Sequence, residues 1–179
     1  MACQSLTSLP LVCGSEGLQA GIQKLYMISY NDLATVASST LNYALATNGV
    51  VNQIGLDASK HFVEIGTLKN VSGLDSAGVF NENGTQYETI TFTTQLTDIT
   101  PEHEAFVDSV KGQEVAVIVQ SKSGKYFVAG IQNGLKMSAL TKSIGKADSD
   151  LIGYTMTFTG NDTLGIKLVE PAIAMSSIG

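Results

Sequence analysis

The sequence predicts a mainly β protein, a β-sandwich or barrel of antiparallel strands with one packed α-helix at about residues 100–111. Three observations support this fold class. Segments rich in β-branched and aromatic residues outnumber helical ones, turn residues join neighbouring segments, and strands do not alternate with helices. With 179 residues, 44% of them hydrophobic, residues 1–179 suffice for a single domain with its own core.

The clearest strand covers residues 86–96, where hydrophobic and polar residues alternate with a period of two. Its inward residues are Ile90, Phe92, Thr94 and Leu96, and its outward residues include Thr89, Thr91 and Thr93. Residues 152–159 alternate in the same way, with Ile152, Tyr154, Met156 and Phe158 facing inward. Both segments therefore predict strands with one buried face.

Other strands are expected at residues 22–30, 50–54, 60–68, 114–120, 125–131 and 164–169. Residues 114–120 are almost continuously apolar, which is typical of a strand buried on both faces. Residues 33–47 fit a helical stripe about as well as a strand, and we favour a strand for their second half.

The helix at residues 100–111 has signals at both ends. Thr100 can cap it, Pro101 suits the first helical position, and Gly112 can end it. His103, Phe106, Val107 and Val110 share one face at helical spacing. This face is expected to lie on the sheet.

The charge composition excludes several classes of protein. Charged residues make up 15% of the chain, the net charge is −6, and all ten basic residues are lysines. Without arginine, tight recognition of phosphate or nucleic acid is not expected. No apolar run is long enough for a membrane span, and the start of the chain lacks the positively charged region of a secretory signal. We therefore expect a cytoplasmic chain without membrane contact.

The residue types that carry catalysis or bind metals are sparse. The two histidines, His61 and His103, are best explained as structural, and Cys3 and Cys13 form no metal or redox motif. No nucleophile elbow or phosphate-binding loop is present. We therefore expect no enzyme activity, no catalytic residue, no cofactor and no metal.

Other candidates for chemistry have simpler explanations. The carboxylates Glu102 and Glu104 suit the positive end of the helix dipole, and Asp148 with Asp150 suits a solvated turn. The adjacent aromatic residues Tyr126 and Phe127 fit core packing better than a stacking platform.

Three segments are hard for one domain to bury in its own core. They are an extended N-terminal arm at residues 1–21, a long loop or protruding hairpin at 70–84, and an apolar C-terminal tail at 171–179. Contacts with copies of the same chain would cover them. The candidate inter-subunit residues are Asn70, Leu74, Asp75, Val79, Phe80 and Asn83 in the loop, and Leu9, Leu11, Val12, Ile173, Met175 and Ile178 at the termini.

Three stretches, residues 21–33, 99–138 and 150–160, resemble virion structural proteins of bacteriophages, in particular of phages that infect Bacteroidetes-type hosts. The most similar class is the tail tube protein of tailed phages. The resemblance implies a β-sandwich subunit that closes into rings, usually hexameric, which stack into a hollow tube. It also implies assembly in the host cytoplasm, contacts with other virion proteins, and DNA as a passing, non-specific cargo.

A conduit for DNA should not retain it, and each lysine or arginine set against a phosphate adds salt-sensitive affinity. Thr89, Thr91 and Thr93 would give a polar, non-adhesive wall, so we assign them as the candidate luminal face. Alternative functions are a neck, head or capsid-decoration protein, a small β-sandwich module that binds glycans, and, least supported, a hydrolase.

Overall fold

The computed structural model describes residues 19–37, 39–67, 71–147 and 150–179, and the described chain is mainly β. Its strands are β1 (Ile22–Ser29), β2 (Tyr43–Leu45), β3 (Val51–Ile54), β4 (Val63–Ile65), β5 (Gly73–Phe80), β6 (Gln86–Thr97), β7 (Glu114–Ser121), β8 (Tyr126–Ala129), β9 (Leu135–Ser143), β10 (Gly153–Asp162) and β11 (Lys167–Val169). The helices are α1 (Pro101–Val110), α2 (Pro171–Ser177) and a 3₁₀ turn, η1 (Tyr30–Asp32).

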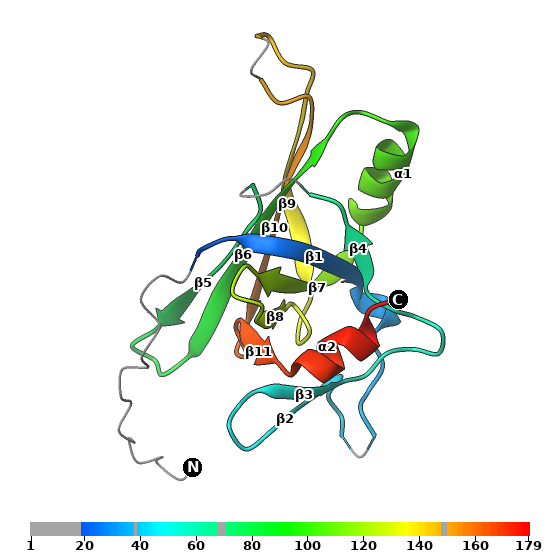
Figure 1. Ribbon diagram of the computed structural model, residues 1–179. Coiled ribbons are helices and arrows are strands. Elements are labelled where there is room, and N and C mark those ends of the chain that lie inside the picture. Colours follow the sequence, from blue (N-terminus) through cyan, green and yellow to red (C-terminus); the bar gives the residue numbers. More distant parts are fainter. Residues whose placement is uncertain (1–18, 38, 68–70, 148–149) are drawn as a thin grey trace.

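All these strands belong to one strongly bent sheet with the order β2-β3-β11-β8-β7-β9-β10-β6-β5, while β1 pairs with β7 and β4 (Figure 1). The pairings are antiparallel except between β11 and β3. Over the described residues the sheet is not closed into a barrel. The fold is therefore sandwich-like, which confirms the predicted class.

Two hydrophobic clusters lie on opposite faces of β1 and β7. Leu25, Met27, Val117 and their neighbours join a first core with the inward faces of β6 and β10. Tyr26, Ile118 and their neighbours join a second core beneath β2, β3, β11 and α2. The continuous apolar run in residues 114–120 follows from this burial on both faces.

Helix α1 forms as its sequence predicts. The Thr100 side chain accepts a hydrogen bond from the backbone N–H of His103, Pro101 starts the helix, and Lys111 is the C-cap residue. Val107 and Val110 are buried in the first core. The helix thereby covers part of that core beside β9 and β10, where Val107 lines one pocket with Leu140 and Tyr154.

The described part of the predicted loop 70–84, residues 71–84, is not a long loop. Residues 73–80 form β5, which pairs with β6 along its whole length, so the hairpin alternative is the correct one. The strand was hard to detect because Gly73, Ser76 and Gly78 give it little hydrophobic alternation. Strand β9 was not predicted either, and Ile152, expected to face inward, is 50% exposed just before β10 begins.

The prediction of an unpacked C-terminal tail is wrong, because residues 171–177 form helix α2. Ala174 is fully buried in the second core, and the backbone N–H of Phe62 donates to the carbonyl of Ser177. Ile173, Ala174 and Ile178 are thus covered by their own chain, whereas Met175 is 60% exposed. Among the described residues, no helix has the length and apolar character needed to cross a membrane.

Candidate functional site

A polar sheet face is the most regular surface of the described chain. Thr91 and Thr93 of β6 lie opposite Thr159 and Thr157 of β10, and the hydroxyl oxygens of Thr93 and Thr157 are 3.5 Å apart. All four side chains are half-buried and point away from the first core. Alternation in both strands therefore produces a ladder of threonines, as the sequence predicted for β6.

The same face continues onto the two flanking strands. Register places Asp75 and Ala77 of β5 beside the β6 threonines, and Ala139 and Thr141 of β9 beside those of β10. Among described residues, the register leaves few charges on this face, chiefly Asp75 and Lys136. The surface is thus polar and nearly uncharged.

Both edges of this four-stranded region are open within the described part of the chain. Among the strands formed by described residues, β5 pairs only with β6. Strand β9 pairs with β7 at Leu135 and Lys136, so within the described ranges residues 137–143 have a partner strand, β10, on one side alone. Open edges present unpaired backbone N–H and C=O groups that can accept another strand.

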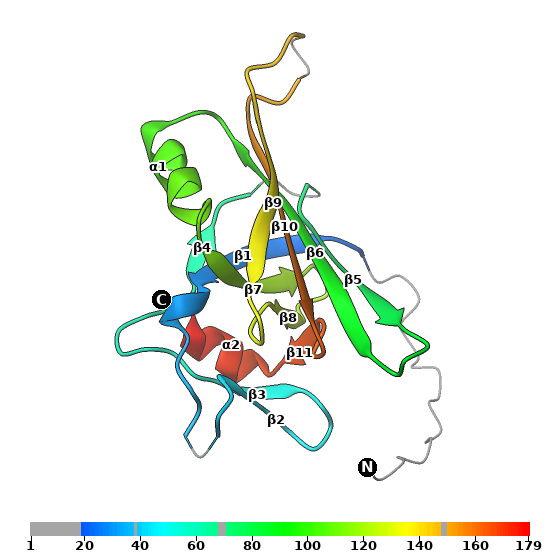
Figure 2. The ribbon, with the colours of Figure 1, turned by 180° about the vertical axis from the view of Figure 1, so that it is seen from behind.

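Exposed apolar side chains mark the two hairpin ends of the region. Phe80, beside the β5–β6 turn, is 76% exposed, and Ile144, beside the β9–β10 turn, is also 76% exposed. Figures 1 and 2 both show the β9–β10 hairpin projecting from the molecule at the end opposite the β5–β6 turn. The sheet therefore carries an apolar side chain near each end.

Both turns are closed by side chains. Asn83 accepts a hydrogen bond from the backbone N–H of Thr85 at 3.1 Å. Asp150 accepts from the backbone N–H groups of Lys146 and Ala147 at 2.8 and 3.0 Å, and these bonds hold the pKa of its carboxyl below the ordinary value. This is the role expected for Asp150 in a turn, whereas Asp148 lies outside the described residues.

The predicted loop residues are divided between the surface and the core. Asp75, Phe80 and Asn83 are exposed, Val79 is half-buried, and Leu74 packs against the first core. Asn70 lies outside the described residues. At least three of the predicted residues are thus available at the surface.

The predicted terminal residues have different positions. Leu9, Leu11 and Val12 lie outside the described residues. Ile173 and Ile178 pack against the second core of their own chain, whereas Met175 is 60% exposed.

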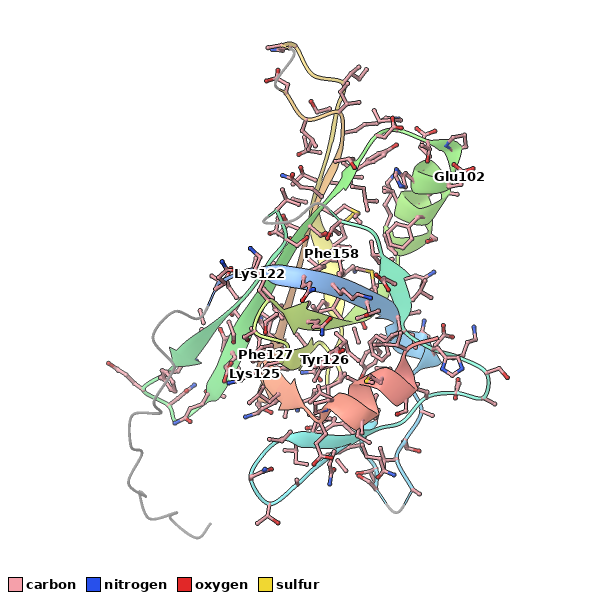
Figure 3. The ribbon with its side chains drawn as sticks, in the orientation of Figure 1. Glu102, Lys122, Lys125, Tyr126, Phe127 and Phe158 are labelled. Carbon is pink, nitrogen blue, oxygen red and sulfur yellow. The ribbon has the colours of Figure 1, made fainter. Side chains whose placement is uncertain are left out.

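The remaining candidates for chemistry mostly have structural roles. His103 contacts the backbone carbonyl of Asp98 through Nδ1 at 3.1 Å, while His61 is exposed, unlike the partly buried residue expected. Figure 3 shows Glu102 at the start of α1, where a backbone hydrogen bond and the Thr100 hydroxyl hold its pKa below the usual value. No group of three potential metal ligands occurs among the described residues.

Tyr126 and Phe127 do not form a common platform. Both residues lie on β8 and are labelled in Figure 3; Tyr126 packs against the second core and Phe127 against the first. Adjacent residues of a strand point to opposite faces, so the two rings belong to two different cores.

One buried carboxyl was missed in the sequence. Asp162 is 3% exposed, lies directly opposite Glu88 across the β10–β6 pair, and accepts a hydrogen bond from the Gly165 N–H at 2.5 Å. Burial raises the pKa of Asp162, and Glu88 adds to this. Burial also raises the pKa of Tyr43, with a further contribution from the charge of Asp162.

No family model matches the chain, and searches of curated proteins and of solved structures find no match.

Proposed function

We propose that this chain is a self-assembling structural subunit whose copies join through the open edges of the β9-β10-β6-β5 region. Within that class, we propose a phage virion protein of the tail tube type, in which rings of subunits surround a lumen for DNA. The observation that carries the proposal is a nearly uncharged hydroxyl face on four strands whose two edges are open as far as the chain is described.

Strand direction supports continuation of the sheet from copy to copy. The four strands alternate in direction, so β5 and β9 at the two edges run in opposite senses. A copy related by rotation would present its β9 antiparallel to the β5 of its neighbour. Such a head-to-tail contact closes into a ring when the rotation divides a full turn.

The chemistry of the threonine face supports its assignment to the lumen. DNA affinity grows with each lysine or arginine that meets a phosphate, whereas hydroxyl groups add little salt-dependent attraction. Thr91 and Thr93 lie in the middle of the four strands, away from both open edges. A ring with these faces turned inward would let DNA pass without holding it.

The hairpin ends support contacts between rings. Phe80 and Ile144 lie near opposite ends of the strands, so stacked rings would bring the upper end of one subunit to the lower end of another. Burial of exposed apolar side chains provides a driving force for such stacking.

Negative-stain electron microscopy and sedimentation velocity of the purified chain test the assembly. We expect rings or tubes whose proportion rises with protein concentration. A species of 18.8 kDa that persists at every concentration, with no rings in the micrographs, would contradict the proposal and favour a binding module.

A charge substitution tests the lumen separately. In assembled protein, Thr91→Lys should retain DNA and release it as salt increases, because each copy adds one phosphate contact. Gln53→Lys is the matched control, since Gln53 is an exposed position on β3 outside the threonine face. Equal DNA retention by both variants, or by neither, would remove the luminal assignment.

A further inference from the structure

The two open edges of the described β9-β10-β6-β5 region lie at different levels along the strands. Residues are level here when the register places them in one row across the sheet. Residues 137–143 of β9 are level, through β10, with β6 from Phe92 to Thr97. Strand β5 is level with β6 from Gln86 to Thr93. The edges therefore overlap in only a short stretch, and Figures 1 and 2 show β5 reaching the β5–β6 turn while β9 extends into the projecting hairpin.

Two copies cannot join these edges with their strands at the same level. Lys136 and Asp75 belong to one row, through Thr159 and Thr91. At Lys136, however, the outer side of β9 already pairs with β7. A neighbouring β5 placed at this level would collide with β7, so the neighbour has to be displaced along the strands.

The continuity of the threonine face restricts this displacement. Residues opposite each other on paired strands share a face, so Thr141 has to lie opposite a β5 residue of the same face, such as Asp75 or Ala77. A slip of one residue would turn the hydroxyl face of the neighbour to the other side. Among the registers that keep the face continuous, the one with Thr141 opposite Asp75 pairs all of residues 137–143 with residues 73–79.

We propose that β9 of one copy pairs with β5 of the next in this register, with Thr141 opposite Asp75. The proposal rests on the proposed assembly and specifies its contact. The side chains that meet on the threonine face are small, with Ala139 opposite Ala77, and the Thr141 hydroxyl can donate to the Asp75 carboxylate. No two like charges face each other along the contact, because Asp75 is the charged residue of β5 and Lys142 that of residues 137–143.

The register also determines how the strands incline in a ring. Thr141 is level with Gln95 of β6 and Asp75 with Thr91, so each copy is shifted by four residues over its four strands. With about 3.4 Å per residue and about 4.8 Å per strand, the shift is roughly 14 Å over a width of roughly 19 Å. This ratio inclines the strands by about 36° to the ring axis, whatever the number of copies, as in barrels with a shear of one residue per strand.

A disulfide cross-link between copies tests the register. In a chain that carries Cys3→Ser and Cys13→Ser, Asp75→Cys is combined with Thr141→Cys, or with Lys136→Cys as the control for copies joined at one level. Opposite residues of paired strands have the Cα separation that a disulfide needs. After mild oxidation we expect the Thr141 pair to give a ladder of linked multiples of 18.8 kDa, at least fivefold stronger than that of the control. A control ladder of equal or greater strength would overturn the register.

Electron cryomicroscopy of the wild-type assembly gives an independent measurement without any cysteine variant. We expect the strands that line the lumen to incline by about 36° to the axis. Rings or tubes whose strands run along the axis would overturn the register and leave the proposed assembly standing. A wild-type chain that forms no rings at any concentration would overturn both.

Discussion

Replacing Asp162 by asparagine tests whether the buried charge of this residue destabilises the folded protein. Asp162 is 3% exposed, faces Glu88 across the strand pair, and accepts a hydrogen bond from Gly165. Asparagine has nearly the same shape and keeps an oxygen that can accept this bond. It removes the charge and replaces the other carboxylate oxygen by an NH2 group.

The expected gain follows from these contacts. Charged pairs directly opposite each other on neighbouring strands change stability by about 0.2–1 kcal/mol, and like charges destabilise. Loss of the repulsion from Glu88 should therefore stabilise Asp162→Asn by up to about 1 kcal/mol at neutral pH. For a chain of this size, that corresponds to a rise in Tm of roughly 2–4 °C.

The gain should depend on pH. Because burial raises the folded-state pKa of Asp162, its contribution to stability is complete below its unfolded pKa and is lost as the pH rises through the folded pKa. The advantage of Asp162→Asn over the wild type should therefore be largest near neutral pH and smallest in acid. Urea unfolding at about pH 7 and about pH 4 measures both free energies.

Asp162→Ala is the control for the hydrogen bond. It leaves the Gly165 N–H without its acceptor and should cost about 1–3 kcal/mol. If Asp162→Asn is destabilised as much as Asp162→Ala, or if its advantage is the same at both pH values, the assignment of a costly buried charge is refuted.

Three further predictions concern an edge, a cap and the C-terminal helix. Ser76→Pro and Ala77→Pro each remove one backbone N–H from β5, and one of these two groups points away from β6. The variant that loses this outward N–H should fail to assemble while the circular dichroism of the subunit stays unchanged. Rings formed by both variants would exclude β5 as a contact. Thr100→Ala removes the acceptor for the His103 N–H and should cost about 1 kcal/mol in thermal unfolding, and an unchanged Tm would show that the cap is dispensable. Deletion of residues 171–179 exposes the second core and should cost roughly 3 kcal/mol or more in denaturant unfolding. An unchanged free energy of unfolding after this deletion would show that the segment does not stabilise the second core.

Local signals in the sequence were sufficient for some elements. Helix α1 has its cap, its proline and its apolar face within a dozen residues, so each could be recognised without knowledge of the fold. Strands β6 and β10 alternate because only one face of each meets the core. The threonine face follows from the same alternation.

Other elements depend on partners far away in the sequence. In β9, a register shift opposite Thr157 and Phe158 interrupts the alternation, which explains why the strand was missed. Helix α2 has Pro171 at its start but covers only seven residues, and its packing against Phe62 and the second core supports it. Asp162 is buried by its pairing with β6 and by the turn to Gly165, neither of which is visible in a hydrophobic pattern.

These differences change where assembly contacts are expected. The sequence suggested residues 70–84 and the termini, but at the C-terminus α2 is packed on its own chain and Ile173 and Ile178 are covered there. The four-stranded region, by contrast, leaves backbone groups of β5 and β9 without a partner among the described residues, and a rearrangement of side chains cannot cover these groups. Backbone pairing also fixes register and direction, whereas apolar contacts alone do not. Edge variants should therefore abolish ring formation, while Met175→Ser, at the exposed face of α2, should leave it intact.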